Sequence, residues 1–331
     1  MLNISNFDYV LPEGSIAQSP LEERDASKLL VGGDPVAHML TRDLPKLLRT
    51  GDVLVLNETR VMPSRMLLKR VTGASIEVLA LEEVDDGRWE ALVRPSRKVS
   101  DGEVLVDQNG KQIVQIGEST GKGTRLISSI SGEMKKIFED SGQIPLPPYI
   151  VNKELDKNRY QTIYAMNENS VAAPTAGLHL TERVIDQCAK NGVSIATLEL
   201  SVGIGTFRPI STHSIHEHIM HAEGYRIGAD TWEKVQNAKR VVAVGTTVVR
   251  ALESVAHTGE LEGKTELYIK PGFNFKVVNA LMTNFHLPKS SLLVMIEAFI
   301  GERWKDLYQI ALQEGYRFLS FGDAMFIERS D

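Results

Sequence analysis

The 331-residue sequence contains a single cysteine, Cys188. One cysteine excludes an intramolecular disulfide framework and any cysteine-based zinc site. Cys188 falls on the apolar face of a helix predicted over 182–191, so we interpret it as a core thiol rather than a nucleophile. The chain also lacks an N-terminal signal pattern and a long apolar run, and we therefore expect a soluble cytoplasmic protein.

An excess of positive charge is missing as well. The formal net charge is −6 at pH 7, which argues against a protein that holds nucleic acid over its whole surface. A local basic patch remains compatible with this charge, and basic residues do gather in the stretches 60–70 and 94–98. Each cluster could be a solvated face, or the two could bind a phosphate backbone. The clusters comprise Arg60, Arg65, Lys69, Arg70, Arg94, Arg97 and Lys98.

Two nucleotide-binding signatures are absent. Gly203-Ile204-Gly205 lacks the third glycine of a dinucleotide-binding turn, and no helix is predicted directly after it. No G-x-x-x-x-G-K-[ST] motif occurs anywhere in the chain. The sequence therefore supports neither a standard dinucleotide-binding fold nor a P-loop NTPase.

A common zinc motif is incomplete in the histidine-rich stretch 213–221. After His216-Glu217 the motif needs a second histidine at position 220, which is a methionine. On a helix, His221 would lie roughly 140° around the axis from His216. A pair formed by His216 and His218 on a strand could still bind zinc. We favour a polar loop that faces a substrate, with the glutamate or a histidine as acid or base and no metal.

The second half of the chain alternates strand and helix patterns. From residue 159 onward, this alternation predicts an α/β fold with a mixed or mainly parallel sheet and packed helices, which the buried strand at 52–57 is expected to join. Strands are predicted at 194–202, 240–244, 265–270, 278–283 and 323–328, and helices at 182–191, 229–239, 246–257, 291–300 and 303–314.

The region between these parts reads as antiparallel β structure. Short runs of β-forming residues recur at near-regular spacing, which predicts a small antiparallel barrel or sandwich. Turn signals separate the runs at Asp86-Gly87, Asp101-Gly102 and Asn109-Gly110. We assign 67–150 to an inserted β-barrel domain, and 1–66 together with 151–331 to a discontinuous α/β catalytic domain.

Four loops at strand and helix ends are rich in glycine and hydroxyl residues. Such loops turn backbone N–H groups toward a ligand, and a helix N-terminus favours an anion or carboxylate. Each loop alone could be a tight connection, but four from one sheet predict a shared crevice along its C-terminal edge. The loops are 170–181, 203–209, 245–250 and 283–289, and Thr181 is the predicted N-cap of the helix that follows the first.

Motifs along nearly the whole chain match one known family. They include Leu56–Val61, Ile144–Tyr149, Ser170–Thr181, Val202–Pro209, Val244–Thr247, Thr283–Pro288 and Gly322–Met325. In these motifs the chain resembles the S-adenosylmethionine:tRNA ribosyltransferase-isomerase family of queuosine biosynthesis. It departs from the family pattern at Leu180, where phenylalanine is usual, at Ile219, where a basic residue is common, and at Glu58, where aspartate or asparagine is more usual.

The resemblance implies a reaction and its partners. The family transfers the ribosyl part of S-adenosylmethionine to 7-aminomethyl-7-deazaguanine at the wobble position of a tRNA anticodon and rearranges the sugar. Adenine and methionine leave, and epoxyqueuosine-tRNA results. S-adenosylmethionine is then a co-substrate, with no permanently bound cofactor and no metal. The expected partner is a tRNA with a GUN-type anticodon, and we expect a monomer with no membrane association.

This chemistry needs at least two titratable groups in a water-poor crevice. A base can remove a C5′ hydrogen that the sulfonium acidifies, and a proton donor can help the adenine to leave. The catalytic candidates are His179, Glu217, His218, His221 and Asp323. The candidates for substrate binding are Thr175, Gly177, Gly203, Gly205, Thr206, Arg208, Gly245, Thr246, Thr247, Arg250, Asn284 and His286. The candidates for tRNA binding are Arg60, Arg65, Arg97, Lys98 and Lys289.

Two rival functions remain open at the level of sequence. A non-catalytic tRNA-binding protein would bind tRNA without turning over S-adenosylmethionine. An S-adenosylmethionine-dependent RNA methyltransferase would release S-adenosylhomocysteine, and the absent glycine fingerprint argues against it.

Overall fold

A computed structural model describes most of the chain and divides it into two compact units. The described residues are 2–85, 87–121, 123–152, 156–203 and 209–330. One unit comprises Met1–Arg60, Pro147–Asn167 and Ala173–Asp331, and the other comprises Val61–Leu146 and Glu168–Ala172.

The larger unit is built on a nine-stranded mixed sheet with the order β15-β13-β12-β3-β14-β16-β17-β1-β2. Its strands are β1 (Lys28–Val31), β2 (Ala37–Leu40), β3 (Asp52–Asn57), β12 (Ser194–Leu200), β13 (Glu223–Arg226), β14 (Arg240–Val244), β15 (Glu262–Thr265), β16 (Ala280–Asn284) and β17 (Ala324–Glu328). The four central strands β12, β3, β14 and β16 run parallel to one another. Every residue of β3 is buried, as expected for a parallel strand covered on both faces.

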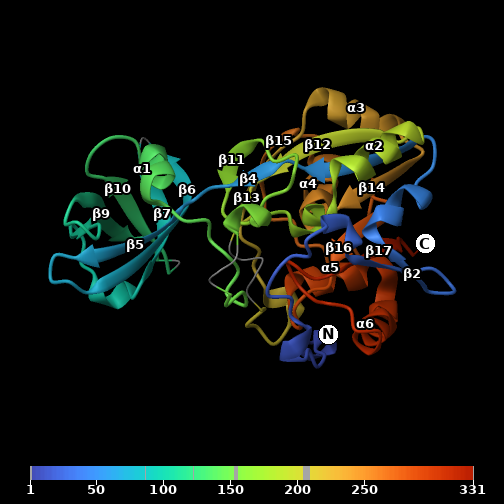
Figure 1. The fold of residues 1–331 in the computed structure, drawn as a ribbon, viewed down its shortest axis with the longest axis horizontal. Helices are drawn as coiled ribbons and strands as arrows, with labels where there is room; N and C mark the ends of the chain where they lie inside the picture. The colour runs from blue at the N-terminus through green and yellow to red at the C-terminus, as the bar shows by residue number, and fades with distance from the viewer. Residues whose placement is uncertain (1, 86, 122, 153–155, 204–208, 331) are drawn as a thin grey trace. The chain divides into compact units, whose positions relative to one another are not determined.

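Helices alternate with these strands along the chain and pack on the sheet (Figure 1). They are α2 (Glu182–Lys190), α3 (Ala229–Asn237), α4 (Thr246–Thr258), α5 (Ser291–Ile300) and α6 (Trp304–Gln313). Val184 and Cys188 of α2 pack into one core cluster with Leu54 and Leu56 of β3. Cys188 is buried and burial raises the pKa of its thiol to about 11, which fits the predicted core role.

The smaller unit contains a closed six-stranded barrel in which all neighbouring strands are antiparallel. Its elements are β5 (Arg65–Arg70), β6 (Ser75–Asp85), β7 (Arg88–Arg94), β8 (Val104–Val106), β9 (Gln112–Ser119), β10 (Arg125–Ser129) and α1 (Met134–Ser141). Trp89 and Phe138 meet edge to face at 5.0 Å in its core. Gly87 and Gly110 adopt positive φ angles of 81° and 84° in the predicted turns. Two further strands, β4 (Thr59–Val61) and β11 (Asn167–Ser170), pair with each other in a separate small sheet.

The predicted fold class, an α/β fold with a mixed sheet and a small antiparallel barrel, is confirmed. The strand predicted at 265–270 is wrong, because β15 ends at Thr265. Side chains bind the backbone beyond that point: Leu267 N donates to Thr265 Oγ1 over 3.1 Å, and the Leu267 carbonyl accepts from Arg250 Nε over 3.1 Å. The four-residue strands β1, β2 and β13 were not predicted, since each is too short to show an alternating pattern.

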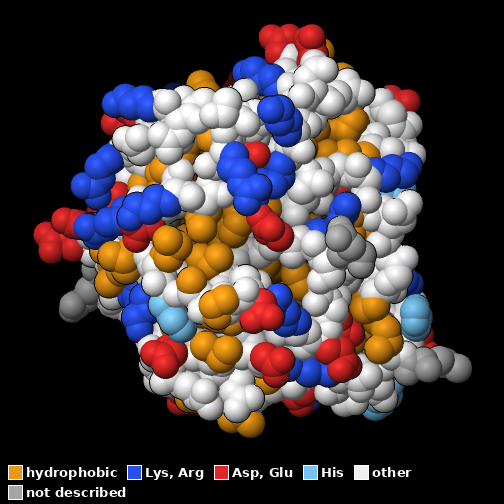
Figure 2. Space-filling model, turned by 90° about the vertical axis from the view of Figure 1, so that its right-hand side faces the viewer, with side chains coloured by type: hydrophobic (Ala, Val, Ile, Leu, Met, Phe, Trp, Pro, Cys, Tyr) orange, Lys and Arg blue, Asp and Glu red, His pale blue; other side chains and the backbone are white. Residues whose placement is uncertain are grey.

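Two surface properties bear on the expectations from composition. Figure 2 shows that basic and acidic side chains are interspersed over one face of the molecule. This mixture agrees with a modest negative net charge and with the absence of one dominant positive surface on that face. Among the described residues, no helix combines the length and the apolar character that crossing a bilayer requires.

Replacing Leu54 tests the core of the larger unit. Leu54 is fully buried on β3, so Leu54→Ala should lower the free energy of unfolding by about 2–5 kcal/mol through lost burial and a new cavity. Hydrogen exchange of peptides from β3 and β14 measures this unit separately from the barrel. Val10 is 85 % exposed, and Val10→Ala should change the free energy by no more than about 0.5 kcal/mol. Equal protection in both variants would contradict this account of the core.

Candidate active site

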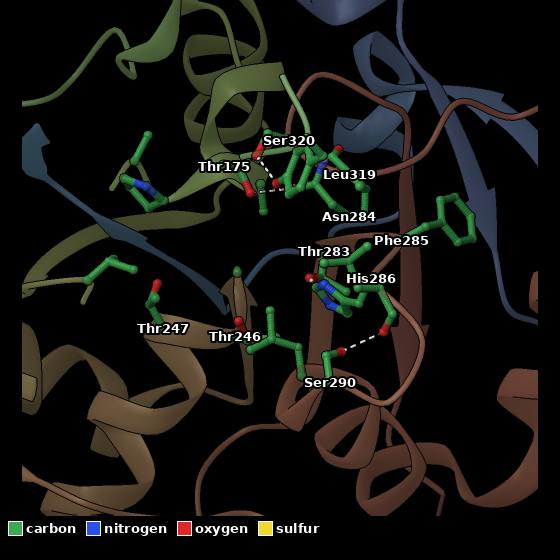
Figure 3. Close-up of a pocket in the computed structure, with 18 residues that line it drawn as sticks. Thr175, Thr246, Thr247, Thr283, Asn284, Phe285, His286, Ser290, Leu319 and Ser320 are labelled. Carbon is green, nitrogen blue, oxygen red and sulfur yellow. Dashed lines mark hydrogen bonds between the residues drawn. The ribbon is translucent and has the colours of Figure 1, made fainter. Parts of the chain in front are cut away.

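A pocket lies in the larger unit at the C-terminal edge of the central strands (Figure 3). The ends of β14 and β16, the start of α4, the 3₁₀ helix η7 (Thr175–His179) and the loop 319–320 supply its walls. Among the described residues that line it, none carries a formal charge on its side chain, His286 being neutral. The polar lining residues are Tyr149, Thr175, Thr246, Thr247, Thr283, Asn284, His286, Ser290 and Ser320.

The pocket wall at β14 is a helix N-terminus. Gly245 follows β14 with a φ of +94°, which favours glycine, and its N–H donates to Met282 O over 2.8 Å. Gly245 is the N-cap of α4 and, lacking a side chain, forms no side-chain cap. Thr246 and Thr247 place hydroxyl groups at the first turn. Free N–H groups and the helix dipole therefore favour a carboxylate or polar oxygen here.

Asn284, at the end of β16, joins three parts of the pocket. Its Oδ1 accepts from Thr175 Oγ1 over 3.0 Å, and its Nδ2 donates to Leu319 O over 3.1 Å. The second Nδ2 hydrogen faces His179 Nε2 at 2.9 Å. Asn284 is only 3 % exposed, so these bonds form out of contact with bulk water and fix η7 and the 319–323 loop against the strand.

His179 is held neutral by this arrangement. Burial lowers the pKa of its imidazole to about 3, and the positive charges of Arg317 and Arg24 add to the effect. Because Asn284 Nδ2 donates to Nε2, the single ring proton belongs on Nδ1. His179 therefore contacts the pocket through Asn284 and does not line it itself.

His286 is the histidine that lines the pocket. Burial lowers the pKa of its imidazole to about 3, so the ring is neutral near pH 7. Its Nε2 lies 3.2 Å from Thr283 Oγ1. The backbone on either side is fixed, because its N–H donates to Tyr308 Oη over 2.9 Å and its carbonyl accepts from Tyr9 Oη. A fixed neutral imidazole that faces a pocket can accept a proton from a bound group.

Several other predicted residues have structural partners. Arg250 forms a buried ion pair with Glu223, and Glu223 Oε1 also accepts from Gly203 N over 2.8 Å. Asp323 accepts from the N–H groups of Lys28 and Arg317 over 2.9 and 2.7 Å. None of these side chains lines the pocket.

Gly177 permits a close contact between backbone and side chain. A Cβ atom at this position would lie 2.0 Å from Tyr164 Oη, so the glycine is needed for packing. It does not line the pocket, whereas Thr175, Gly245, Thr246, Thr247, Asn284 and His286 do.

The predicted acid–base loop lies outside the pocket. Glu217 ends the 3₁₀ helix η9 (Ile215–Glu217) and is exposed, as is His221. The ring of His218 packs edge to face on Tyr268 at 5.3 Å, and burial together with His221 lowers the pKa of its imidazole. The catalytic roles of Glu217, His218 and His221 stay predictions. The predicted substrate-binding residues Gly205, Thr206 and Arg208 lie outside the described residues.

The residues predicted to bind tRNA occupy different settings. Arg97 and Lys98 are exposed on the 3₁₀ helix η5 (Ser96–Lys98) of the smaller unit, and Arg60 is exposed in the larger one. Arg65 forms an ion pair of 2.8 Å with Glu77. Lys289 forms one of 2.7 Å with Asp8. These two cations are thus already paired, and their roles toward tRNA stay predictions.

The predicted N-cap of α2 is confirmed, and its carboxylate comes from the chain itself. Thr181 Oγ1 accepts from Val184 N over 3.4 Å and donates to Asp25 Oδ2 over 2.7 Å. Burial alone would raise the pKa of Asp25, but hydrogen bonds from Arg183 and Thr181 outweigh it and hold the pKa below its ordinary value. The N-terminus of α2 is therefore occupied by an internal anion.

Sequence reasoning missed one hydroxyl pair in the pocket wall. Tyr149 Oη lies 2.6 Å from Ser320 Oγ, and both residues line the pocket. Tyr149 ends the rigid motif Ile144–Tyr149 that supports the family resemblance, which was the only signal that could have pointed to it. In the described part of the chain, no group of three or more histidine, cysteine, aspartate or glutamate residues is arranged to hold a metal ion.

Comparisons with known proteins give one consistent result. A family model described as "Queuosine biosynthesis protein" matches residues 4–327. The S-adenosylmethionine:tRNA ribosyltransferase-isomerase of Moorella thermoacetica is 47 % identical over 98 % of this chain and 100 % of its own length. The enzyme of the same name from Halothermothrix orenii is 43 % identical with the same coverage.

A solved structure is similar as well. The crystal structure of S-adenosylmethionine tRNA ribosyltransferase from Thermotoga maritima shares 36 % sequence identity with this chain and superposes with a TM-score of 0.56. The match covers 98 % of this chain and 100 % of that one. The solved structure is therefore similar to this chain in sequence and in fold.

The two buried histidines should make stability depend on pH. Their pKa values fall from 6.5 to about 3 on folding, so the unfolded chain binds more protons between these values. The stabilisation is complete above pH 6.5 and is lost as the pH falls, by up to about 1.4 kcal/mol per pH unit and histidine. Urea unfolding of wild type, His179→Gln and His286→Gln between pH 7.5 and 4.5 measures this slope.

Each substitution should make the slope shallower. His213→Gln, at an exposed histidine, serves as the control and should leave the slope unchanged. Equal slopes in wild type and both core variants would contradict the neutral, buried state of these rings.

Proposed function

The chain belongs to the queuosine biosynthesis protein family, and on this premise we propose that it is an S-adenosylmethionine:tRNA ribosyltransferase-isomerase. The family predicted from the motifs is confirmed, and the chain is an enzyme of queuosine biosynthesis. In the proposed reaction the ribosyl moiety of S-adenosylmethionine is transferred to 7-aminomethyl-7-deazaguanine in the tRNA anticodon and isomerised. Epoxyqueuosine-tRNA forms, and adenine and methionine leave.

One observation carries the proposal. Relatives that bear this enzyme name are 43–47 % identical along 98 % of the chain and along their own full length. S-adenosylmethionine is then the co-substrate. The partner is a tRNA with a GUN-type anticodon that already carries the aminomethyl base, and the enzyme acts as a monomer.

The uncharged pocket suits a substrate with a sulfonium. A cation in the wall would repel the sulfonium, and a carboxylate would stabilise the charged sulfonium relative to the neutral thioether that leaves in methionine. Hydroxyl groups of Thr246 and Thr247 and the free N–H groups of α4 can bind ribose hydroxyls or the methionine carboxylate. The scarcity of water in such a pocket also keeps an attacking amine neutral.

We assign the proton transfers first to His286. Its neutral ring lines the pocket and can take a C5′ proton, and the resulting imidazolium can return a proton to the departing adenine. His179 acts as a positioning residue, because it reaches the pocket only through Asn284. Glu217 is the alternative base, in a loop that does not line the pocket.

The reaction itself is the first test. The protein is incubated with S-adenosylmethionine and tRNA that carries the aminomethyl-deazaguanine, with and without a chelator, and the products are identified by mass spectrometry. We expect adenine, methionine and a heavier tRNA nucleoside in both samples. S-adenosylhomocysteine would instead indicate methyl transfer. Intact tRNA binding without turnover would indicate a binding protein.

The role of His286 has its own test. His286→Gln should lower kcat by about 10²-fold or more, the usual range for loss of a general acid–base group, with little change in tRNA affinity. His257→Gln, at the last turn of α4, is the matched control and should retain activity. Glu217→Gln runs in parallel. Full activity of His286→Gln together with loss in Glu217→Gln would transfer the proton step to the loop at 215–217.

A further inference from the structure

A second cavity in the larger unit lies beside the pocket. Arg24, Arg159 and Arg317 line it, together with His179 and Ser320. Ser320 also lines the pocket itself, so its side chain lies between the two spaces. The cavity is therefore positively charged, whereas the described residues that line the neighbouring pocket carry no charge.

Two of the three guanidinium groups have no carboxylate partner among the described residues. Within the part of the chain that the structure describes, Arg24 donates to the carbonyl groups of Gln161 and Leu178, and Arg159 donates to those of Leu21 and Glu22. Neither Arg24 nor Arg159 forms an ion pair with an acidic side chain in the described part of the chain. Arg317 lies 3.8 Å from Asp323 Oδ1.

Three of the acidic groups near the cavity are engaged elsewhere, whereas Glu22 lines the adjoining depression. Asp25 is bound by Arg183 over 2.8 Å, and Glu23 pairs with Arg42 over 3.0 Å. Asp323 is directed at backbone N–H groups at the start of β1 and in the 317–323 loop. The positive charge of the three cavity arginines is thus only partly compensated within the protein.

Arg159 also has one hydrogen-bond donor without a partner. Its Nε is buried and has no hydrogen-bond partner among the described residues. The charge of Arg159 also acts on Arg24, where burial first and this repulsion second lower the pKa of the guanidinium. Like charges held together with an unsatisfied donor are costly unless an anion joins them.

We propose that Arg24, Arg159 and Arg317 bind a phosphate of the tRNA backbone next to the nucleotide that enters the pocket. Guanidinium groups match the non-bridging oxygens of a phosphodiester with paired N–H donors. The site rests on the proposed function, since it needs tRNA as substrate. It differs from the basic residues expected from sequence, because its members come from three distant parts of the chain.

The shape of the surface favours a polymer over a small carboxylate. Arg24 and Arg159 also line a wider and more open depression, whose other walls are Glu22, Glu23, Asp25, Thr181 and Arg183. The sugar–phosphate backbone of tRNA can continue from the cavity along this depression. The carboxylate of S-adenosylmethionine would need only a closed cavity. Both ligands offer an oxyanion, so the experiment must separate them.

The test measures two affinities in wild type and in the double variant Arg159→Gln/Arg317→Gln. Binding of tRNA is followed by fluorescence anisotropy at several salt concentrations, and binding of S-adenosylmethionine by calorimetry. We expect tRNA affinity to fall roughly tenfold or more, and the slope of log Kd against log salt to fall by about 0.7 for one lost phosphate contact on single-stranded RNA. The Kd for S-adenosylmethionine should stay unchanged.

Two controls separate binding from folding and from net charge. Arg303→Gln/Lys305→Gln makes the same change of two charges at exposed residues and should leave tRNA affinity near that of wild type. Arg159→Lys/Arg317→Lys keeps the charge but loses the paired donors, so it should retain the salt slope with an intermediate loss of affinity. Thermal unfolding confirms that each variant is folded.

The remaining outcomes would overturn the proposal. Weaker binding of S-adenosylmethionine with unchanged tRNA affinity would assign the cavity to the methionine carboxylate. No change in either affinity would make the arginines structural. If either of these results is obtained and the wild type still forms epoxyqueuosine-tRNA, the phosphate site is wrong while the proposed function stands. A wild type that binds tRNA without turnover contradicts the function alone.

Discussion

The side-chain amide of Asn284 is the interaction on which the candidate site depends. One buried amide ends the central strand β16 and binds Thr175 of η7, the carbonyl of Leu319 and the ring of His179. These three partners belong to segments that are more than 30 residues away from it in sequence. Because each buried polar atom needs its partner, the amide fixes the segments in one arrangement. The pocket wall is thus determined by a polar network as much as by apolar packing.

This network also separates two electrostatic environments. Asn284 lines a pocket whose described walls carry no charged side chain, and His179 lines the cavity with three arginines. His179 stays neutral because burial and the charges of Arg317 and Arg24 all oppose its protonation. A neutral ring can stand between the two spaces without carrying positive charge into the pocket. Under the proposed function, chemistry and tRNA anchoring can therefore occupy adjacent sites with opposite electrostatic needs.

Sequence predicted the local features and failed on the long-range ones. The bounds of β14 and α5 match the predictions, because continuous apolar runs and helix-opening serines or glycines carry a strong local signal. The ion pair between Arg250 and Glu223 and the contact between Tyr149 and Ser320 join residues 27 and 171 positions apart. No local pattern encodes such partners. Arg250 was expected in the site; its guanidinium is buried against Glu223, and its role toward the substrate stays a prediction.

The two loops that deliver the chain into α2 and α4 show why a motif alone does not identify a ligand site. Both combine small residues with threonine at a helix start, and both should favour an anion at free N–H groups. At α2 the side chain of Thr181 caps the helix and Asp25 supplies the anion, so the end is satisfied within the fold. At α4 the cap is Gly245, which has no side chain to donate or accept, and the first turn faces the pocket. The difference lies in a carboxylate 156 residues away from Thr181, which binds at the start of α2, whereas the first turn of α4 lines the pocket.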